Sequence, residues 1–298
     1  MRDLRVVQIT DTHIRPAGEV LYDTVDTYAN LTVVLDRLRA SGPVDALVLS
    51  GDLTDNGSPE GYRRLRAAVE PVAAELGAAV LYVMGNHDER GAFGVELLGQ
   101  EPGAVRVKKP HDQVLEVAGL RIIALDSTTP GRHDGKLEAG QLAWLGRRLR
   151  RPAPRGTLLV LHHPPLPSGL PVMEQLNLEQ SVRLAAVIAG TDVRMVLCGH
   201  NHVTTAGSLG GVPVWVGPAV AYRFDAMPPV GRMRAVQGFG YSRIDVLGME
   251  FVVSAVEATP AAPVYERPEA EMLALLREIE QARAQAPVGV PVRDGAAG

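Results

Sequence analysis

Six short segments of the chain combine aspartate, asparagine and histidine, whose oxygen and nitrogen atoms bind metal ions in proteins. Together these donors suit hard or borderline cations such as manganese, iron or zinc. A thiolate from Cys198 is not required for such a site. The segments are Asp11-Thr12-His13, Gly51-Asp52, Gly85-Asn86-His87-Asp88, Asp126, His162-His163 and Gly199-His200-Asn201-His202. Their residue types predict a metal centre.

The balance of charge favours two metal ions and an anionic substrate. Two divalent ions, less the charges of Asp11, Asp52 and a hydroxide, leave about +1 to attract a phosphoryl group. Ions ~3.5–4 Å apart can bind that group and stabilise both its attacking and its leaving oxygen. Holding them so close needs a shared carboxylate, for which Asp52 is the candidate. One histidine should stay off the metals to donate to a phosphoryl or leaving oxygen, and His87 beside Asn86 fits that role.

Strand geometry indicates which neighbouring side chains can act together. Residues two apart in an extended segment project to the same side. We therefore expect Asp11 to form a clamp with His13, and His200 to form one with His202. Adjacent residues project oppositely, so only one histidine of the pair at 162 and 163 should reach the site.

Each polar segment follows a short apolar run that is typical of a strand buried on both faces. Ligand sites in open α/β sheets lie outside the carboxyl ends of the strands. Residues scattered over ~190 positions can therefore converge on one crevice. The predicted strands are Leu4–Thr10, Ala46–Ser50, Ala79–Met84, Leu120–Leu125, Thr157–Leu161 and Val193–Cys198.

Helical stretches alternate with these strands, which indicates an α/β sheet. Ser58 and Pro59 supply an N-cap and a first helical residue, and Gly77 supplies a stop for the second helix. The predicted helices are Thr24–Ala40, Pro59–Leu76, Leu137–Arg150 and Glu174–Ala189.

The second half of the chain favours antiparallel strands. Val114–Val117 should form a hairpin with the strand that follows it, so we expect a mixed sheet. Ala206–Val216 and Ser242–Glu257 indicate further antiparallel strands around the loop Gly217–Tyr241. Two sheets packed between helices would accommodate both halves without a domain break. We therefore predict one catalytic domain over residues 1–258.

Residues 259–298 are predicted to form a proline- and alanine-rich linker, one helix and a disordered tail from Ala286 to Gly298. The helix has Met272, Leu275, Leu276 and Ile279 on one face. That apolar stripe could pack on the core or join a second subunit. We therefore include a homodimer among the expectations.

Composition and charge exclude several classes of protein. The 298 residues are 46% apolar and 21% charged, with a formal net charge of -4. This balance argues against sequence-independent binding of nucleic acid, which needs a basic face. Apolar runs fall short of the ~20 residues of a membrane-spanning helix, and no signal-peptide pattern begins the chain. With one cysteine and no intrachain disulfide, we expect a cytoplasmic protein.

The ordered segments resemble the calcineurin-like metallophosphoesterase superfamily over roughly Val6 to Val216, about seventy per cent of the chain. Within it they are most similar to the bacterial class III 3',5'-cyclic nucleotide phosphodiesterases. The resemblance implies an α/β fold, a four-layer α/β/β/α sandwich with two mixed β-sheets. Asn201 departs from that branch, which often has an apolar residue there. The matching stretches are Gln8–His13, Tyr82–Asp88, Leu161–Pro165 and Thr191–Arg194.

The resemblance also implies a role for each site residue. His162 is preferred to its neighbour because the motif histidine of related sequences precedes one residue and then proline. His87 is implied as the catalytic residue, and Asn86, His87 and His202 as contacts to the substrate. The implied ligands of one metal are Asp11, His13, Asp52 and His202, and those of the other are Asp52, Asn86, His162 and His200.

The expected activity is hydrolysis of 3',5'-cyclic nucleotides such as cAMP to monophosphates through a metal-bridging hydroxide. The expected cofactors are two ions of iron or manganese, with zinc as an alternative, and the expected partner is a small phosphodiester. Two alternatives stay open. One is a phosphodiesterase for 2',3'-cyclic nucleotides or glycerophosphodiesters, and the other is a non-catalytic binding module on the same scaffold.

Several polar residues keep two interpretations. Asp126 follows a strand without a ligand-type partner nearby, so we favour an orienting or structural role. Asp88 either caps the next helix or orients a ligand. Arg223, Arg232 and Arg234 either belong to a solvated loop or recognise a base or phosphate.

Overall fold

The computed structural model describes residues 2–105 and 109–285, and it divides the chain into two units. The first unit, Met1–Thr259, holds both large sheets and the helices α1 to α6. The second unit, Pro260–Gly298, contains helix α7 (Glu269–Gln285). The tail predicted from residue 286 lies outside the described residues. Within the described ranges, none of the helices combines the length and the apolarity that crossing a membrane requires.

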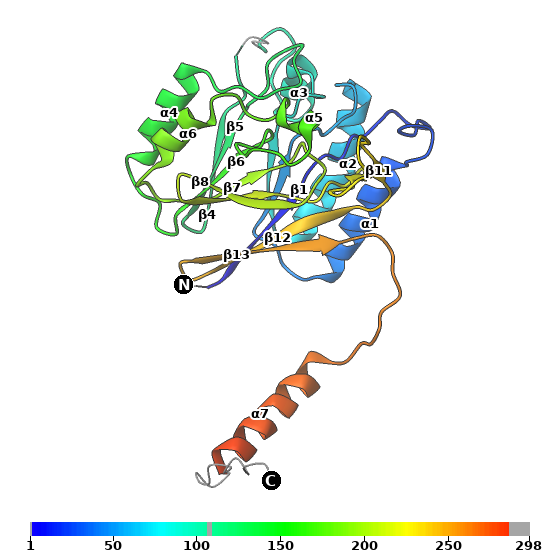
Figure 1. The fold of residues 1–298 in the computed structure, drawn as a ribbon, viewed down its shortest axis with the longest axis vertical. Helices are drawn as coiled ribbons and strands as arrows, with labels where there is room; N and C mark the ends of the chain where they lie inside the picture. The colour runs from blue at the N-terminus through cyan, green and yellow to red at the C-terminus, as the bar shows by residue number, and fades with distance from the viewer. Residues whose placement is uncertain (1, 106–108, 286–298) are drawn as a thin grey trace, which may run out of the picture. The chain divides into compact units, whose positions relative to one another are not determined.

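The first large sheet is mixed and has the strand order β13-β12-β1-β2-β3. Strands β1, β2 and β3 are parallel, whereas β12 and β13 pair antiparallel beside β1. The carboxyl ends of the three parallel strands therefore lie side by side (Figure 1). The strands are β1 (Leu4–Ile9), β2 (Ala46–Ser50), β3 (Ala79–Val83), β12 (Gly240–Leu247) and β13 (Glu250–Glu257).

The second large sheet is also mixed and has the order β4-β5-β6-β7-β9-β8. Strands β5, β6, β7 and β9 are parallel, and the edge strands β4 and β8 are antiparallel to their neighbours. The strands are β4 (Gln113–Val117), β5 (Leu120–Leu125), β6 (Thr157–Leu161), β7 (Val193–Cys198), β8 (Thr205–Leu209) and β9 (Val212–Val216). A separate two-stranded hairpin contains β10 (Arg223–Phe224) and β11 (Ala235–Val236).

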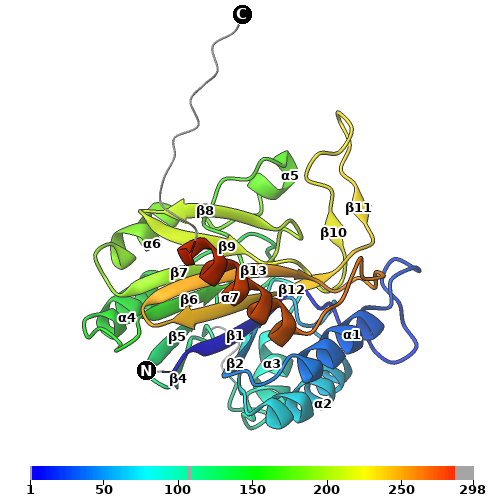
Figure 2. The ribbon, with the colours of Figure 1, turned by 90° about the horizontal axis from the view of Figure 1, so that it is seen from below.

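Alternating burial along the strands produces the four layers. In β2, Leu47 and Leu49 pack toward α1 and α2, while Val48 packs into the core between the two sheets. In β6, Leu159 packs toward α4 and α6, while Val160 enters the same central core. The predicted α/β/β/α sandwich is therefore confirmed (Figure 2). The helices are α1 (Thr27–Ala40), α2 (Pro59–Leu76), α3 (Arg90–Glu96), α4 (Ala139–Leu149), α5 (Pro171–Glu174) and α6 (Ser181–Ile188).

A buried glutamine joins the carboxyl ends of strands from the two sheets. Gln8 of β1 donates to Ser50 Oγ in β2 at 2.9 Å and to the Cys198 carbonyl in β7 at 2.8 Å. All three residues are fully buried, so these bonds form without competition from water. The strand ends that carry the predicted metal ligands are thus fixed relative to one another.

Three predicted helices were wrong in extent, one of them only slightly, since α4 spans Ala139–Leu149 instead of Leu137–Arg150. The first begins at Thr27 instead of Thr24, because Asp26 caps it by accepting from Ala29 N. The stretch 174–189 is two helices, α5 and α6, and not one. Gln180, just before α6, has a left-handed φ of 50° that no continuous helix could contain.

Candidate metal centre

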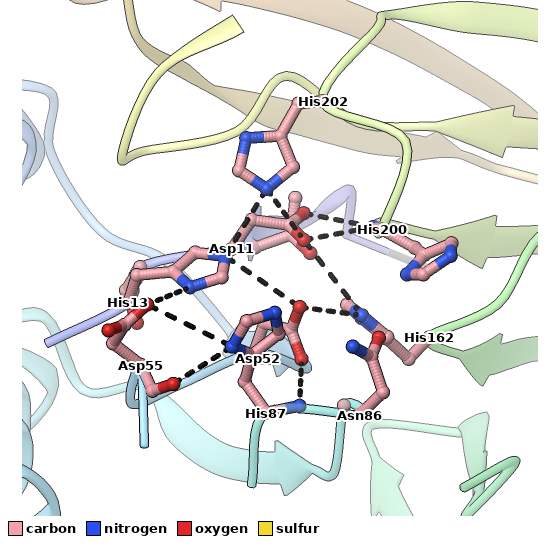
Figure 3. Close-up of polar contacts among 12 residues, drawn as sticks. Asp11, His13, Asp52, Asp55, Asn86, His87, His162, His200 and His202 are labelled. Atoms are coloured by element: carbon pink, nitrogen blue, oxygen red, sulfur yellow. Dashed lines mark hydrogen bonds and ion pairs between the residues drawn. The ribbon is translucent and has the colours of Figure 1, made fainter. Parts of the chain in front are cut away.

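Side chains from both sheets meet in two groups of buried metal-binding residues (Figure 3). The first group follows strands β1 and β7, and the second follows β2, β6 and β7. In each group, one potential ligand atom per residue lies within 4.8 Å of the others. Each group has one carboxylate and two imidazoles, which is a chemistry suited to a divalent cation. The groups are Asp11, His13, His202 and Asp52, His162, His200.

Asp52 belongs to the second group and also approaches the first. Its Oδ2 is 3.2 Å from His162 Nε2 in its own group and 3.6 Å from His13 Nε2 in the other. Its Oδ1 accepts from the backbone N–H of His87 at 2.9 Å, which fixes the carboxylate plane. One side chain can therefore reach two neighbouring cations.

Three histidines are oriented by bonds to their Nδ1 atoms. His162 Nδ1 lies 3.0 Å from the Ser50 carbonyl, and His202 Nδ1 lies 2.8 Å from the Tyr222 carbonyl. A carbonyl oxygen only accepts, so each Nδ1 carries the proton and donates it. His13 Nδ1 is 3.2 Å from the carboxylate of Asp55. These bonds direct Nε2 of each ring into the site as the potential ligand atom, where the Nε2 atoms of His13 and His202 lie 3.2 Å apart.

Buried atoms without hydrogen-bond partners support a fit to metal ions. Among the described residues, Asn86 Oδ1 and His200 Nε2 are buried and lack such a partner, and His162 Nε2 has only the Asp52 and Asp11 carboxylates near it, at 3.2 and 3.9 Å. Leaving them so costs free energy unless something else satisfies them. The Asn86 amide is oriented by its Nδ2, which donates to His133 Nδ1 at 3.3 Å and turns Oδ1 elsewhere. All three are atoms that bind cations, so the donor set fits metals.

The backbone at the ligands is left-handed and not extended, so the extended geometry behind both predicted clamps is wrong, although Asp11 and His13 do meet in one group. The φ values are 72° at His200 and 50° at His202, and positive values recur at Asp11, His13 and Asp52. Non-glycine residues in this region are strained, and such strain concentrates at functional sites. Because the chain turns at these residues, His200 and His202 enter different groups instead of forming one clamp.

Two motif glycines allow the ligand loops to pack closely. A Cβ atom at Gly85 would collide with the backbone nitrogen of Asp52, and one at Gly199 would collide with the side chains of Thr10 and Asp11. Both collisions involve atoms that are fixed by the fold. The absence of a side chain at these positions is therefore needed to bring the loops together.

Burial and mutual charge set the protonation of the site. Burial lowers the pKa of His200 to about 3 and that of His202 to about 4, so both rings are neutral and ready to bind a cation. Burial also opposes charge on His162, but Asp52 and Asp11 outweigh it and raise its pKa to about 9. The same proximity to His162 and His13 outweighs the effect of burial on Asp52 and holds its pKa well below its usual range.

His87 lies beside the two groups and is partly exposed. Its ring centroid is 4.7 Å from that of His13, and its Nδ1 lies 2.8 Å from the Asp55 carbonyl oxygen. That bond leaves Nε2 free. Asp55 therefore contacts two site histidines, and His13, Asp55 and His87 form a third group of potential ligands. Sequence analysis did not single out Asp55, which lies three residues after the predicted ligand Asp52.

The site opens into a small pocket of about 140 Å³. His133 lines this pocket together with the site histidines. The apolar side chains that line it are Met173, Leu176, Tyr222 and Phe224. Sequence analysis did not single out these four residues, because no local pattern marks an ordinary apolar residue as one that lines a pocket.

The remaining candidate residues lie around the site or away from it. Asp126 forms an ion pair with Arg90 at 3.1 Å, and His163 binds Ser127 Oγ at 2.8 Å. Both interactions are structural. Asp88 accepts from backbone groups of the loops that carry Asp52 and Asn86, so it orients those loops instead of capping α3.

The arginines of the 217–241 segment are paired with acidic residues or are exposed. Arg234 pairs with Asp225, and Arg223 pairs with Glu257 at 3.5 Å. Arg232 is exposed. The paired arginines have their charge neutralised locally, so the geometry does not favour them as phosphate ligands.

Comparison with known proteins agrees with this geometry. The chain is 44% identical over 234 residues to a Rhodococcus erythropolis protein named "Probable cyclic nucleotide phosphodiesterase", covering 78% of this chain and 76% of that one. It is 43% identical over 237 residues to the "cAMP/cGMP dual specificity phosphodiesterase MT0825" of Mycobacterium tuberculosis, covering 79% and 73%.

Among solved structures, the fold matches the purple acid phosphatase PPD1 of yellow lupin with a TM-score of 0.61 at 16% identity. That match covers 88% of this chain and 52% of the phosphatase, and it concerns the fold alone. The model of the calcineurin-like phosphoesterase family matches residues 4–204, a range that contains every residue of the two ligand groups. With this match and relatives above 40% identity, the chain belongs to the calcineurin-like phosphoesterase family.

Proposed function

We propose that this protein hydrolyses 3',5'-cyclic nucleotides to nucleoside 5'-monophosphates with the help of two divalent metal ions. The observation that carries the proposal is the position of the Asp52 carboxylate between two buried groups of ligands. The names of the two relatives at 44% and 43% identity support the choice of substrate. The catalytic unit we propose is residues 1–258.

The proposed ligands follow the two groups, with Asn86 added to the second. Bound there, two divalent ions supply Lewis-acid stabilisation of the phosphoryl oxygens and activate water for attack on phosphorus. Their attraction for a phosphate anion is strengthened because the site is buried. We propose that one ion is held by Asp11, His13, Asp52 and His202, and the other by Asp52, Asn86, His162 and His200.

Residues at the mouth of the site handle the substrate. In hydrolysis the bond from phosphorus to the 3' oxygen breaks, the oxygen of water joins phosphorus, and the 3' oxygen takes up a proton. His87 supplies that proton or a hydrogen bond through Nε2, because its Nδ1 is held by the Asp55 carbonyl. Asn86 and His202 line the same pocket as His87, where the second Nδ2 hydrogen of Asn86 and the carbon edge of the His202 ring would contact the phosphoryl group.

A substrate panel tests the activity. Manganese-loaded protein is incubated with 3',5'-cAMP, 3',5'-cGMP, 2',3'-cyclic AMP, a glycerophosphodiester and an aryl phosphate monoester. We expect the two 3',5'-cyclic nucleotides to give 5'-monophosphates at the highest kcat/KM. Preference for another diester, or turnover of the monoester alone, would overturn the substrate assignment.

Two variants test the roles of the residues. Asp52→Ala should lose bound metal and nearly all turnover, whereas His87→Ala should keep both ions and turn over roughly 10²–10⁴-fold more slowly. Asp36→Ala is the matched control, since that side chain is 63% exposed on α1. Unchanged rates in both site variants would leave only a binding function.

The metal identities, a cytoplasmic location and a homodimer stay predictions. Metal analysis of purified protein addresses the first, where iron and manganese are expected and zinc is the alternative. Solution mass of the full chain, compared with a chain shortened to residue 259, addresses the dimer. An unaltered number of chains per particle would contradict assembly through α7.

A further inference from the structure

Two projecting segments flank the mouth of the catalytic pocket. One is the segment of α5, and the other is the β10–β11 hairpin, and both stand beyond the strand ends (Figures 1 and 2). Met173 and Leu176 line the pocket from the first segment, and Tyr222 and Phe224 line it from the second. The pocket therefore has two apolar walls above its polar floor.

The hairpin wall is tied directly to a proposed metal ligand. Phe224 N donates to the His202 carbonyl at 2.9 Å, and the Tyr222 ring lies 4.3 Å from the His202 ring. Tyr222 and Phe224 meet edge to face with centroids 5.5 Å apart. Such contacts fix the angle between the rings, so this wall is preformed.

The opposite wall is tied to the loop that follows His162. Leu178 N donates to the Pro164 carbonyl at 3.0 Å, and the Asn177 side chain donates to the Leu166 carbonyl at 2.8 Å. Met173 of α5 is only 6% exposed, so its side chain packs this helix against the rest of the fold. Both walls are therefore positioned by the same loops that carry the metal ligands.

The volume of the pocket limits what it can enclose. Pockets that bury a whole small ligand are roughly 300–1,000 Å³ in volume. This one is about 140 Å³, enough for a phosphoryl group and its immediate neighbours. The organic part of a larger phosphodiester must therefore leave through the mouth, between the two walls.

The side chains of the two walls favour a ligand group that has a flat apolar face. Among the described lining residues, the polar groups other than His133 and the Tyr222 hydroxyl are the proposed ligands and His87. Two of the hairpin arginines, Arg223 and Arg234, are paired with acidic residues, and the residues that line this pocket include no arginine. Aromatic and aliphatic side chains recognise the face of a ring and not the hydrogen-bonding pattern on its edge.

We propose that Tyr222 and Phe224 on one side, and Met173 and Leu176 on the other, clamp the ring of the substrate and recognise its face alone. The inference rests on the proposed function, and it adds that adenine and guanine are held alike. A hydrophobic clamp rejects a polar isostere only weakly, so discrimination between the two purines should be small.

Titrations with the reaction product distinguish binding by the clamp from binding by the metal centre. Calorimetric titrations of manganese-loaded protein with 5'-AMP, 5'-GMP and inorganic phosphate compare ligands with and without a ring. Phe224→Ala and Leu176→Ala should weaken 5'-AMP about five- to tenfold and leave phosphate unchanged. In the wild type, 5'-AMP and 5'-GMP should bind within about threefold of each other.

Matched controls lie on the same two segments. Val172 on α5 is 50% exposed and Met227 on the hairpin is 88% exposed, and neither lines the pocket. Val172→Ala and Met227→Ala should bind all three ligands as the wild type does. Retained phosphate binding also shows that a variant is folded and metal-loaded.

The outcomes distinguish this proposal from the proposed function. Equal loss of 5'-AMP and phosphate, no loss of either, or a preference for one purine above about tenfold would overturn the clamp. Failure of the wild type to hydrolyse any cyclic nucleotide would overturn the function. Ring-selective losses in Phe224→Ala and Leu176→Ala would then still support the clamp.

Discussion

Asp55 holds His13 from the side away from the ligand groups, with its Oδ1 3.2 Å from His13 Nδ1. Its Oδ2 forms an ion pair with Arg15 at 2.6 Å, which fixes the carboxylate. A carboxylate behind a metal-binding histidine sets the tautomer and the direction of the ring. Asp55 thus orients a proposed ligand without belonging to either of the two groups.

Removing this carboxylate should weaken the metal site. We expect Asp55→Ala to lower manganese affinity about 10–100-fold, measured by metal titration followed by activity. Asp55→Asn should lose less, because an amide oxygen can still accept from His13. Wild-type affinity in the alanine variant would contradict the orienting role.

Asp88 joins two of the ligand loops by accepting five hydrogen bonds, one of them from Thr54 Oγ1 at 3.4 Å. Its Oδ2 accepts from Leu53 N at 3.1 Å and from Gly85 N at 2.9 Å. Its Oδ1 accepts from Thr54 N at 3.1 Å and from Tyr62 Oη at 2.9 Å. Both oxygens face donors, so a carboxylate fits this position and an amide does not.

Asp88→Asn should therefore place an amide N–H₂ against other donors. We expect a loss of about 1–3 kcal/mol in the free energy of unfolding, measured by urea denaturation, together with weaker manganese binding. Tyr62→Phe removes the donor to Asp88 and the acceptor of Glu89 N, and it should cost about 1–3 kcal/mol while keeping two metals per chain. Equal metal affinity in Asp88→Asn and the wild type would refute the joining role.

Much of the fold was predictable because local signals agree with the packing. Each buried strand is a nearly continuous apolar run, and the predicted bounds of β2, β5, β6 and β7 are confirmed. Helix α2 was located to the residue because Ser58 caps it and Gly77 ends it with φ 73°. At these elements, local chemistry and tertiary structure require the same conformation.

Other features depend on contacts that no local pattern shows. The break between α5 and α6 follows from long-range bonds such as that of Asn177 to Leu166, not from periodicity. The hairpin pair β10–β11 is only two residues long on each side, too short to leave a signal. Asp55 is identified only when the fold brings it to His13, 42 positions away.

His133 should influence the site through the amide of Asn86. It accepts from Asn86 Nδ2 at 3.3 Å and so turns the Asn86 oxygen toward the ligand groups. We expect His133→Ala to weaken binding of the second manganese ion about three- to tenfold without changing the first, measured by stepwise metal titration. Pro130→Ala, an exposed change in the same loop, is the control and should bind both ions normally. Two unchanged binding steps in His133→Ala would show that the Asn86 amide needs no such partner.

Asp112 should make the free energy of unfolding depend on pH. Burial, reinforced by nearby Asp126, raises the pKa of Asp112 from 3.8 to about 6. The folded state therefore favours the protonated form, and the stability that Asp112 contributes below pH 4 is lost as the pH rises through 6.

Asp112→Asn cannot ionise, and its Oδ1 can still accept from Gln141 Nε2, as Asp112 does at 2.8 Å. We expect the variant to unfold at a higher temperature than the wild type at pH 8, with a smaller difference at pH 4.5. Asp36→Asn, at an exposed site, should show no such trend. A difference that stays constant between the two pH values, or grows toward acid, would exclude ionisation of Asp112 as its source.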